Sequence, residues 1–126
     1  MILASRRGKA FAIAFVALLA SAAVARVLLR ASNMRACDTL MRVVIEGGYR
    51  PEDTAVGTAA LSYSIYTHDH VSELLASAAR WTSQPESLRA HATASDTTQV
   101  LLADGMTYVV FYDASGRAKD YLCVPP

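Results

Sequence analysis

Between residues 32 and 48, apolar side chains recur at intervals of three and four positions, which is the spacing of one helical face. Ser32 or Asn33 can cap this helix, and Gly47-Gly48 ends it. The apolar positions are Met34, Cys37, Leu40, Met41, Val44 and Ile45. Because Cys37 belongs to this set, we expect its sulfur to point toward whatever the helix packs against.

The pattern of residues 49–66 fits two different elements. Leu61, Tyr63 and Ile65 alternate with two serines, which predicts a short strand after a turn-rich connection. The same segment also fits a helix that begins at Pro51. One side of this helix would carry Ala55, Val56, Ala59 and Tyr63. The sequence leaves both interpretations open.

A second helix has a clearer pattern. Thr67 or Asp69 can cap it. Its apolar positions at helical spacing are Val71, Leu74, Leu75, Ala78 and Trp81. We expect one or two helical turns after Pro85. Because residues 82–98 are rich in serine and threonine, we also expect this segment to be the most flexible of the chain.

Three short apolar runs close the chain, and the turns between them predict how they pair. Asp104-Gly105 has the composition of a two-residue hairpin turn, and residues 113–117 fit a type I turn with a left-handed glycine. The result is an antiparallel meander of three strands. Its expected partners are Val100 with Val109, Leu102 with Thr107, Val109 with Tyr121, and Thr107 with Cys123.

In this register both faces of the meander are apolar. The face expected to form the core contains Val100, Leu102, Val109, Phe111, Tyr121 and Cys123. The opposite face would normally be more polar if it met solvent. Residues 49–66 could cover it, or its apolar side chains could form an exposed patch that binds another protein, with Tyr108 and Tyr112 as anchors. The candidate contact residues are Leu101, Met106, Tyr108, Val110 and Tyr112.

These patterns predict an α+β domain with two helices packed on a three- or four-stranded antiparallel sheet. The chain has two cysteines, Cys37 and Cys123. The helix periodicity and the strand register place both sulfurs in the same interface. In an oxidising compartment such a pair predicts a structural disulfide.

The first 25 residues have a different character. Arg6, Arg7 and Lys9 precede an uncharged run, and Ala23-Val24-Ala25 offers a cleavage site. This order predicts a signal peptide over residues 1–25 and a single domain over residues 26–126, exported to the periplasm or secreted. The alternative is an uncleaved anchor in the inner membrane. However, the uncharged run is shorter than the roughly 20 residues that cross a bilayer as a helix.

Composition supports this division. The 126 residues are 53% hydrophobic and carry a formal charge of +1. Residues 26–126 alone hold nine basic and eleven acidic side chains. These values exclude a polybasic nucleic-acid binder, a multi-pass membrane protein and a disordered chain. We expect contact with a membrane only through an uncleaved N-terminal segment.

His68-Asp69-His70 is the one dense cluster of potential metal ligands, and His91 could add a third nitrogen for zinc or copper. However, the cluster stands where a helix begins, and residues two apart on a helix do not face each other. Metal or small-ligand binding through His68, His70 and His91 is therefore the alternative function. The main interpretation requires no cofactor.

Enzymatic signatures are absent from the sequence. It contains no Gly-x-Ser-x-Gly elbow, and Gly47-Gly48 follows a helix where a phosphate-binding loop would precede one. The neighbouring carboxylates Glu52-Asp53 are typical of a solvated helix start. We therefore expect a protein without catalytic activity.

The segment from Met106 to Val124 combines an aromatic strand, an Asp-x-x-Gly-Arg turn and a returning strand. It resembles the closing hairpin of small bacterial periplasmic domains of the outer-membrane-assembly lipoprotein and beta-lactamase-inhibitor-protein type. This chain lacks the lipidation cysteine, and its cysteine pair is not part of that pattern. The resemblance implies a non-enzymatic binding domain of the cell envelope and transfers no functional residue. With the patterns above, it predicts a protein that binds another protein, as an inhibitor, an immunity factor or an envelope accessory.

Overall fold

The computed structural model describes residues 32–125; the signal peptide expected over residues 1–25 lies outside them. The first described element is the N-terminal helix, which covers residues 32–46 of this range. It is followed by α2 (Pro51–Gly57), β1 (Ser62–Thr67), the 3₁₀ turn η1 (His68–His70), α3 (Val71–Ala78), α4 (Pro85–Thr93), β2 (Thr97–Ala103), β3 (Met106–Tyr112) and β4 (Ala118–Val124). Among the described helices, none is long and apolar enough to span a membrane.

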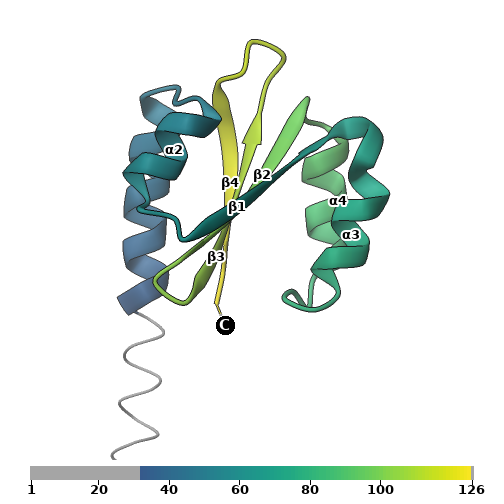
Figure 1. Cartoon of the computed structure of the whole chain (residues 1–126), viewed down its shortest axis with the longest axis horizontal. Coiled ribbons are helices and arrows are strands. Elements are labelled where there is room, and N and C mark those ends of the chain that lie inside the picture. The colour runs from purple at the N-terminus through teal and green to yellow at the C-terminus, as the bar shows by residue number, and fades with distance from the viewer. Residues whose placement is uncertain (1–31, 126) are drawn as a thin grey trace, which may run out of the picture. The chain divides into compact units, whose positions relative to one another are not determined.

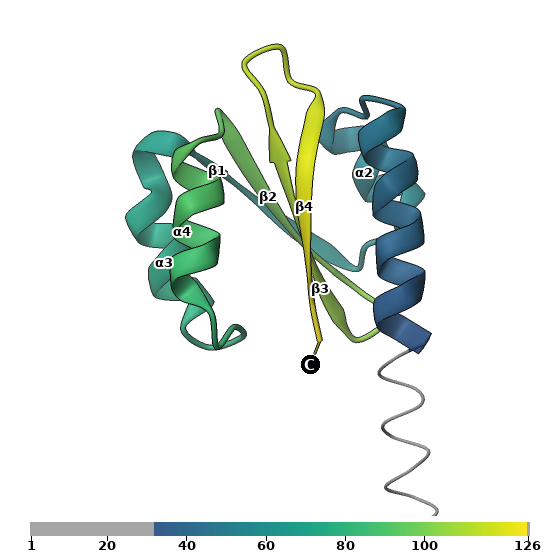
Figure 2. The same cartoon turned by 180° about the vertical axis from the view of Figure 1, so that it is seen from behind.

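The four strands form one antiparallel sheet in the order β1-β2-β3-β4, which confirms the predicted α+β class. The sheet stands between two pairs of helices (Figures 1 and 2). The N-terminal helix and α2 cover one face, and α3 and α4 cover the other. The sequence predicted two helices packed on the sheet, and the structure has a pair of helices on each face, because each face buries its own apolar side chains.

The hairpin between β2 and β3 confirms the predicted register. Val100 pairs with Val109 and Leu102 with Thr107. The backbone angle φ is +53° at Asp104 and +72° at Gly105, as a two-residue turn of this kind requires.

The register predicted between β3 and β4 was wrong by one residue. Tyr108 pairs with Cys123, and Val110 pairs with Tyr121. The cause is an irregularity near the turn: Tyr112 pairs with Ala118 while Phe111 pairs with Asp120, so Lys119 is an extra residue in β4. One extra residue transfers every later side chain of β4 to the other face of the sheet.

The predicted disulfide between Cys37 and Cys123 is confirmed, with a Cα–Cα distance of 6.1 Å. It joins the N-terminal helix to β4 on the face that carries Tyr108 and Val110, not on the face that the sequence analysis assigned to the core. The shifted register of β4 places Cys123 there. The pairing was thus predicted correctly, but the face was not.

Residues 49–66 contain both elements that the sequence left open, one after the other. Pro51 begins α2, and the alternation of Leu61, Tyr63 and Ile65 continues into β1. The N-terminal helix and α2 both end in a left-handed residue, Gly48 with φ +57° and Ala59 with φ +51°. In each case the amide group of the left-handed residue and that of the residue after it donate to carbonyl groups of the last turn, which is the Schellman arrangement.

The opposite face buries Val109 and Phe111 of β3 against α3 and α4. The helical turns expected after Pro85 are present as α4, whose Leu88 and Ala92 are buried in this interface. The predicted caps also differ. Residues 32 and 33 are already helical, and Thr67 makes no capping bond to α3 because its hydroxyl is bonded to His70 Nδ1 at 2.8 Å.

Candidate functional site

The side chains predicted to form an exposed patch are buried. Leu101, Met106, Val110 and Tyr112 are at most 1% exposed, and Tyr108 is 3% exposed. All five pack in the cluster beneath the N-terminal helix and α2. Since α2 lies within residues 49–66, the covering of this face by that segment is the explanation that the structure supports. The five residues form core, and no partner can reach them in this fold.

Tyr112 ends in a polar network inside that core. Its hydroxyl lies 2.5 Å from Gln99 Oε1 and 2.9 Å from Thr54 Oγ1. Gln99 Nε2 donates to the carbonyl group of Pro51 at 3.0 Å. Burial is the main reason that the pKa of Tyr112 rises to about 12, with smaller contributions from the nearby carboxylates Glu52 and Asp53. The network attaches α2 to the sheet and leaves Tyr112 protonated at neutral pH.

The three histidines of the alternative metal site have separate partners. His68 Nε2 lies 3.1 Å from Asp69 Oδ1, and His70 is bonded to Thr67. His91 stacks on Phe111, with ring centroids 5.2 Å apart, and its Nε2 lies 3.2 Å from Asp120 Oδ2. Over residues 32–125, no group of three or more histidine, cysteine, aspartate or glutamate side chains is placed to hold a metal ion. The predicted convergence of His91 on the pair therefore does not occur.

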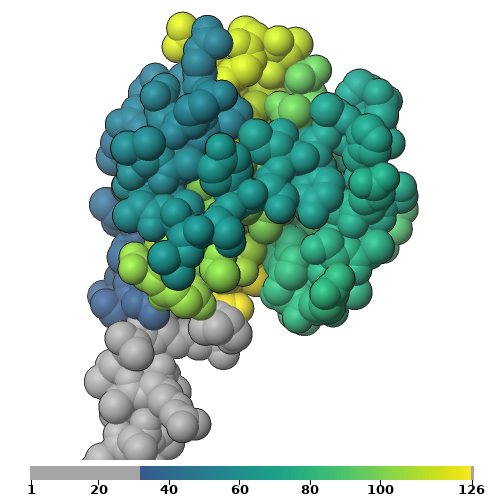
Figure 3. Space-filling view, in the orientation of Figure 1, coloured from purple at the N-terminus to yellow at the C-terminus, as the bar shows by residue number. Residues whose placement is uncertain are grey.

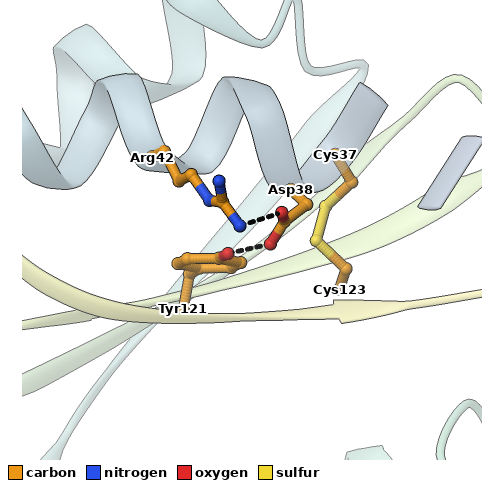
Figure 4. The surroundings of a disulfide bond; sticks show 5 residues. All are labelled: Cys37, Asp38, Arg42, Tyr121 and Cys123. Carbon is orange, nitrogen blue, oxygen red and sulfur yellow. Dashed lines mark hydrogen bonds and ion pairs between the residues drawn. A yellow bond between two sulfur atoms is a disulfide. The ribbon is translucent and has the colours of Figure 1, made fainter. Parts of the chain in front are cut away.

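An open groove of about 570 Å³ lies beside the disulfide, between the N-terminal helix and β4. In its wall, Asp38 pairs with Arg42 Nη2 at 2.9 Å and accepts a hydrogen bond from Tyr121 (Figure 4). That bond raises the pKa of the Tyr121 hydroxyl group. The lining residues are Met34, Arg35, Asp38, Asp120, Tyr121, Leu122 and Cys123. The groove is rigid at its disulfide end and mixed in polarity.

The sheet edge formed by β1 has the most unusual surface among the described residues. Every residue of β1 except the half-buried Tyr66 is exposed, and the strand contains no charged residue, proline or bulge. Leu61 just before it is 83% exposed, Tyr63 is 48% exposed and Ile65 is 46% exposed. Tyr63 lies opposite Leu101 and Ile65 opposite Gln99, so these two side chains project from the face of the sheet that α2 covers.

The backbone of β1 also offers unpaired hydrogen-bonding groups. The amide group of His68 donates to Asp96 O at 3.0 Å, on the side of β2. Because the direction of the N–H and C=O groups alternates along an antiparallel strand, those of Tyr63, Ile65 and Thr67 point away from β2. Within residues 32–125, no other strand adjoins that side, since β1 is the edge of the sheet. The region of β1, between α2 and α3, is uncovered at the front of the space-filling view (Figure 3).

The other edge of the sheet, β4, has the features that protect natural sheet edges from further pairing. It carries the extra residue Lys119, which is charged, and next to it Asp120. Pro125 follows the strand. Figure 2 looks onto this edge, and Figure 1 onto that of β1. The two edges of one sheet therefore differ in whether another strand can be added.

Sequence reasoning placed Leu61, Tyr63 and Ile65 in a possible strand but gave them no functional role. The signal was present, because a strand without charge or proline is an unprotected edge wherever the fold leaves it at the end of a sheet. Whether a strand lies at the end of a sheet depends on the order of the strands, and the local sequence pattern does not indicate that order. No family model, curated protein or solved structure matches this chain.

Proposed function

We propose that this chain is an exported, non-enzymatic domain that acts by binding protein, in the manner of an inhibitor, an immunity factor or an envelope accessory protein. The observation that carries the proposal is the open edge at β1, with the exposed side chains of Leu61, Tyr63 and Ile65 beside unpaired backbone groups. Such an edge recognises protein by adding a strand. The backbone bonds supply affinity, and alternate side chains supply specificity.

Export is supported by two independent features. The pattern of residues 1–25 is that of a signal peptide. The disulfide between Cys37 and Cys123 is compatible with an oxidising compartment, since such bonds persist there. We place the working domain in the periplasm or outside the cell. Retention by an uncleaved N-terminal segment in the inner membrane is the alternative location.

Site-specific photo-crosslinking tests protein binding at this edge. A photoreactive amino acid replaces Tyr63 in the full chain, and the cells that produce it are irradiated. The matched control carries the same probe at Arg89, which is exposed on α4. We expect a protein adduct from position 63 and none from position 89.

Two second-site variants sharpen the result. Ile65→Pro removes an amide group that points away from β2 and should abolish the adduct, because proline cannot donate at the edge. Val56→Lys changes an exposed apolar residue outside β1 and should leave the adduct intact. Absence of an adduct at position 63, or equal adducts at positions 63 and 89, contradicts protein binding at β1.

A further inference from the structure

The edge of β1 is complementary to itself. Its outward-pointing backbone groups belong to Tyr63, Ile65 and Thr67, all at odd positions. When two antiparallel copies meet with Ser64 on the twofold axis, Tyr63 of each copy lies opposite Ile65 of the other. Both positions then present their donors and acceptors to each other, as a hydrogen-bonded antiparallel pair requires. A shift of one residue would instead oppose outward groups to inward ones.

The side chains fit the same arrangement. An aromatic residue opposite a β-branched residue is a favourable cross-strand pair, and the twofold axis creates it twice. Residues 62–67 contain no charged side chain, so the pairing brings no like charges together.

The protected edge at β4 explains why such an assembly would stop at two chains. Pairing of β1 with β4 of another copy would be head-to-tail and would continue into a filament. Lys119 and Asp120 in an irregular strand oppose that contact. Pairing of β1 with itself uses one patch on both chains and leaves no unprotected edge.

We propose that a second copy of this chain pairs antiparallel with β1, so that two four-stranded sheets become one continuous sheet about a twofold axis. This proposal rests on protein binding at β1 and names the partner. The dimer leaves both grooves beside the disulfides free, because β1 and β4 are opposite edges of the sheet.

Sedimentation of the purified protein, as the cells produce it, tests the stoichiometry. We expect twice the mass of one chain for the unmodified protein and for Val56→Lys, and the mass of one chain for Ile65→Pro with an unchanged circular dichroism spectrum. A monomeric unmodified protein overturns the proposal. So does a dimer that Val56→Lys dissociates and Ile65→Pro does not, because its interface would lie elsewhere.

Amide hydrogen exchange gives a readout that needs no variant. The amide groups of Tyr63 and Ile65 point away from β2 and are protected only if another strand pairs there. In the dimer they should exchange at least about 100-fold more slowly than on an open edge, as slowly as those of Ser64 and Tyr66. Rapid exchange at Tyr63 and Ile65 beside slow exchange at Ser64 and Tyr66 overturns the dimer.

The crosslinking experiment separates the two proposals. An adduct of twice the chain mass from position 63 supports both. An adduct with a different protein supports protein binding at β1 and overturns the second copy as its partner. Absence of any adduct at position 63 overturns both.

Discussion

Tyr112 donates a hydrogen bond of 2.5 Å to the side-chain oxygen of Gln99 across β2 and β3, inside the core. The donor is fixed by the rest of the network, because the amide nitrogen of Gln99 is already bound to the carbonyl group of Pro51. Both side chains are fully buried. The sequence left open whether Tyr112 is covered or is an exposed aromatic anchor, and the structure places it in a buried polar contact. The stability of the fold therefore depends on one hydroxyl group.

Tyr112→Phe should destabilise the protein by about 1–3 kcal/mol, because it leaves Gln99 Oε1 buried without its donor. Urea unfolding monitored by circular dichroism measures the change. Tyr63→Phe is the control: its ring is on the exposed edge, and the substitution should stay within about 0.5 kcal/mol. Equal stabilities of Tyr112→Phe and the unmodified protein would contradict the network.

The same hydroxyl group predicts a loss of stability at alkaline pH. Burial raises the pKa of Tyr112 from 10.0 to about 12. Below pH 10 the group is protonated in both states, and its contribution is complete. Above pH 10, the tyrosine loses its proton in the unfolded chain but keeps the proton in the folded protein. The free energy of unfolding therefore falls by about 2–3 kcal/mol as the pH approaches 12. The stability difference between the unmodified protein and Tyr112→Phe should therefore shrink over this range, and a constant difference would contradict the assignment.

Reduction of the disulfide should lower the free energy of unfolding by about 2–5 kcal/mol, because the bond restricts an unfolded loop spanning 86 positions. Urea unfolding with and without reductant measures this loss. The native protein should contain no free thiol, and two thiols per native chain would show that the bond does not form.

Gly48 and Ala59 end two helices in the same left-handed conformation, so opposite substitutions should have opposite effects. Gly48→Ala should destabilise the protein by about 1 kcal/mol, since a side chain is strained there. Ala59→Gly removes that strain and should stabilise by a similar amount. Thermal unfolding of the two variants compares them, and a shift of the same sign in both would be inconsistent with this explanation.

Export predicts a change in mass. Protein recovered from the periplasm or the medium should begin at Arg26, after loss of residues 1–25. Replacement of Ala23 and Ala25 by bulky residues should block cleavage, since the site needs small side chains. Mass spectrometry of fractionated cells distinguishes the outcomes. Full-length protein confined to the membrane fraction would favour the anchored alternative.

The two strand pairings of the C-terminal meander show what a local sequence pattern can predict and what it cannot. Asp104-Gly105 correctly predicts the β2–β3 pairing, because its turn geometry leaves little choice. Lys119 offers no comparable signal, since an extra residue in a strand needs no glycine or proline to mark it. The disulfide was nevertheless predicted, because it depended on the count and compartment of the cysteines more than on the face of the sheet.

The candidate surface was missed for a different reason. Tyr108 and Tyr112 looked like binding residues because both faces of one sheet were apolar, and the helices that bury both faces come from separate parts of the chain. Tyr63 and Ile65 had the alternation of a half-buried strand, yet they stand at the edge of the sheet. Whether the side chains of a strand are exposed depends on the place of that strand in the sheet. A local sequence pattern predicts the strand itself but not its place in the strand order.

The bond between Cys37 and Cys123 also makes almost the whole domain a covalent ring. A protease that cuts once in the connection between α3 and α4 would open this ring without releasing a fragment. The cut molecule would keep both helix pairs attached to one sheet, and its two pieces would separate only after reduction.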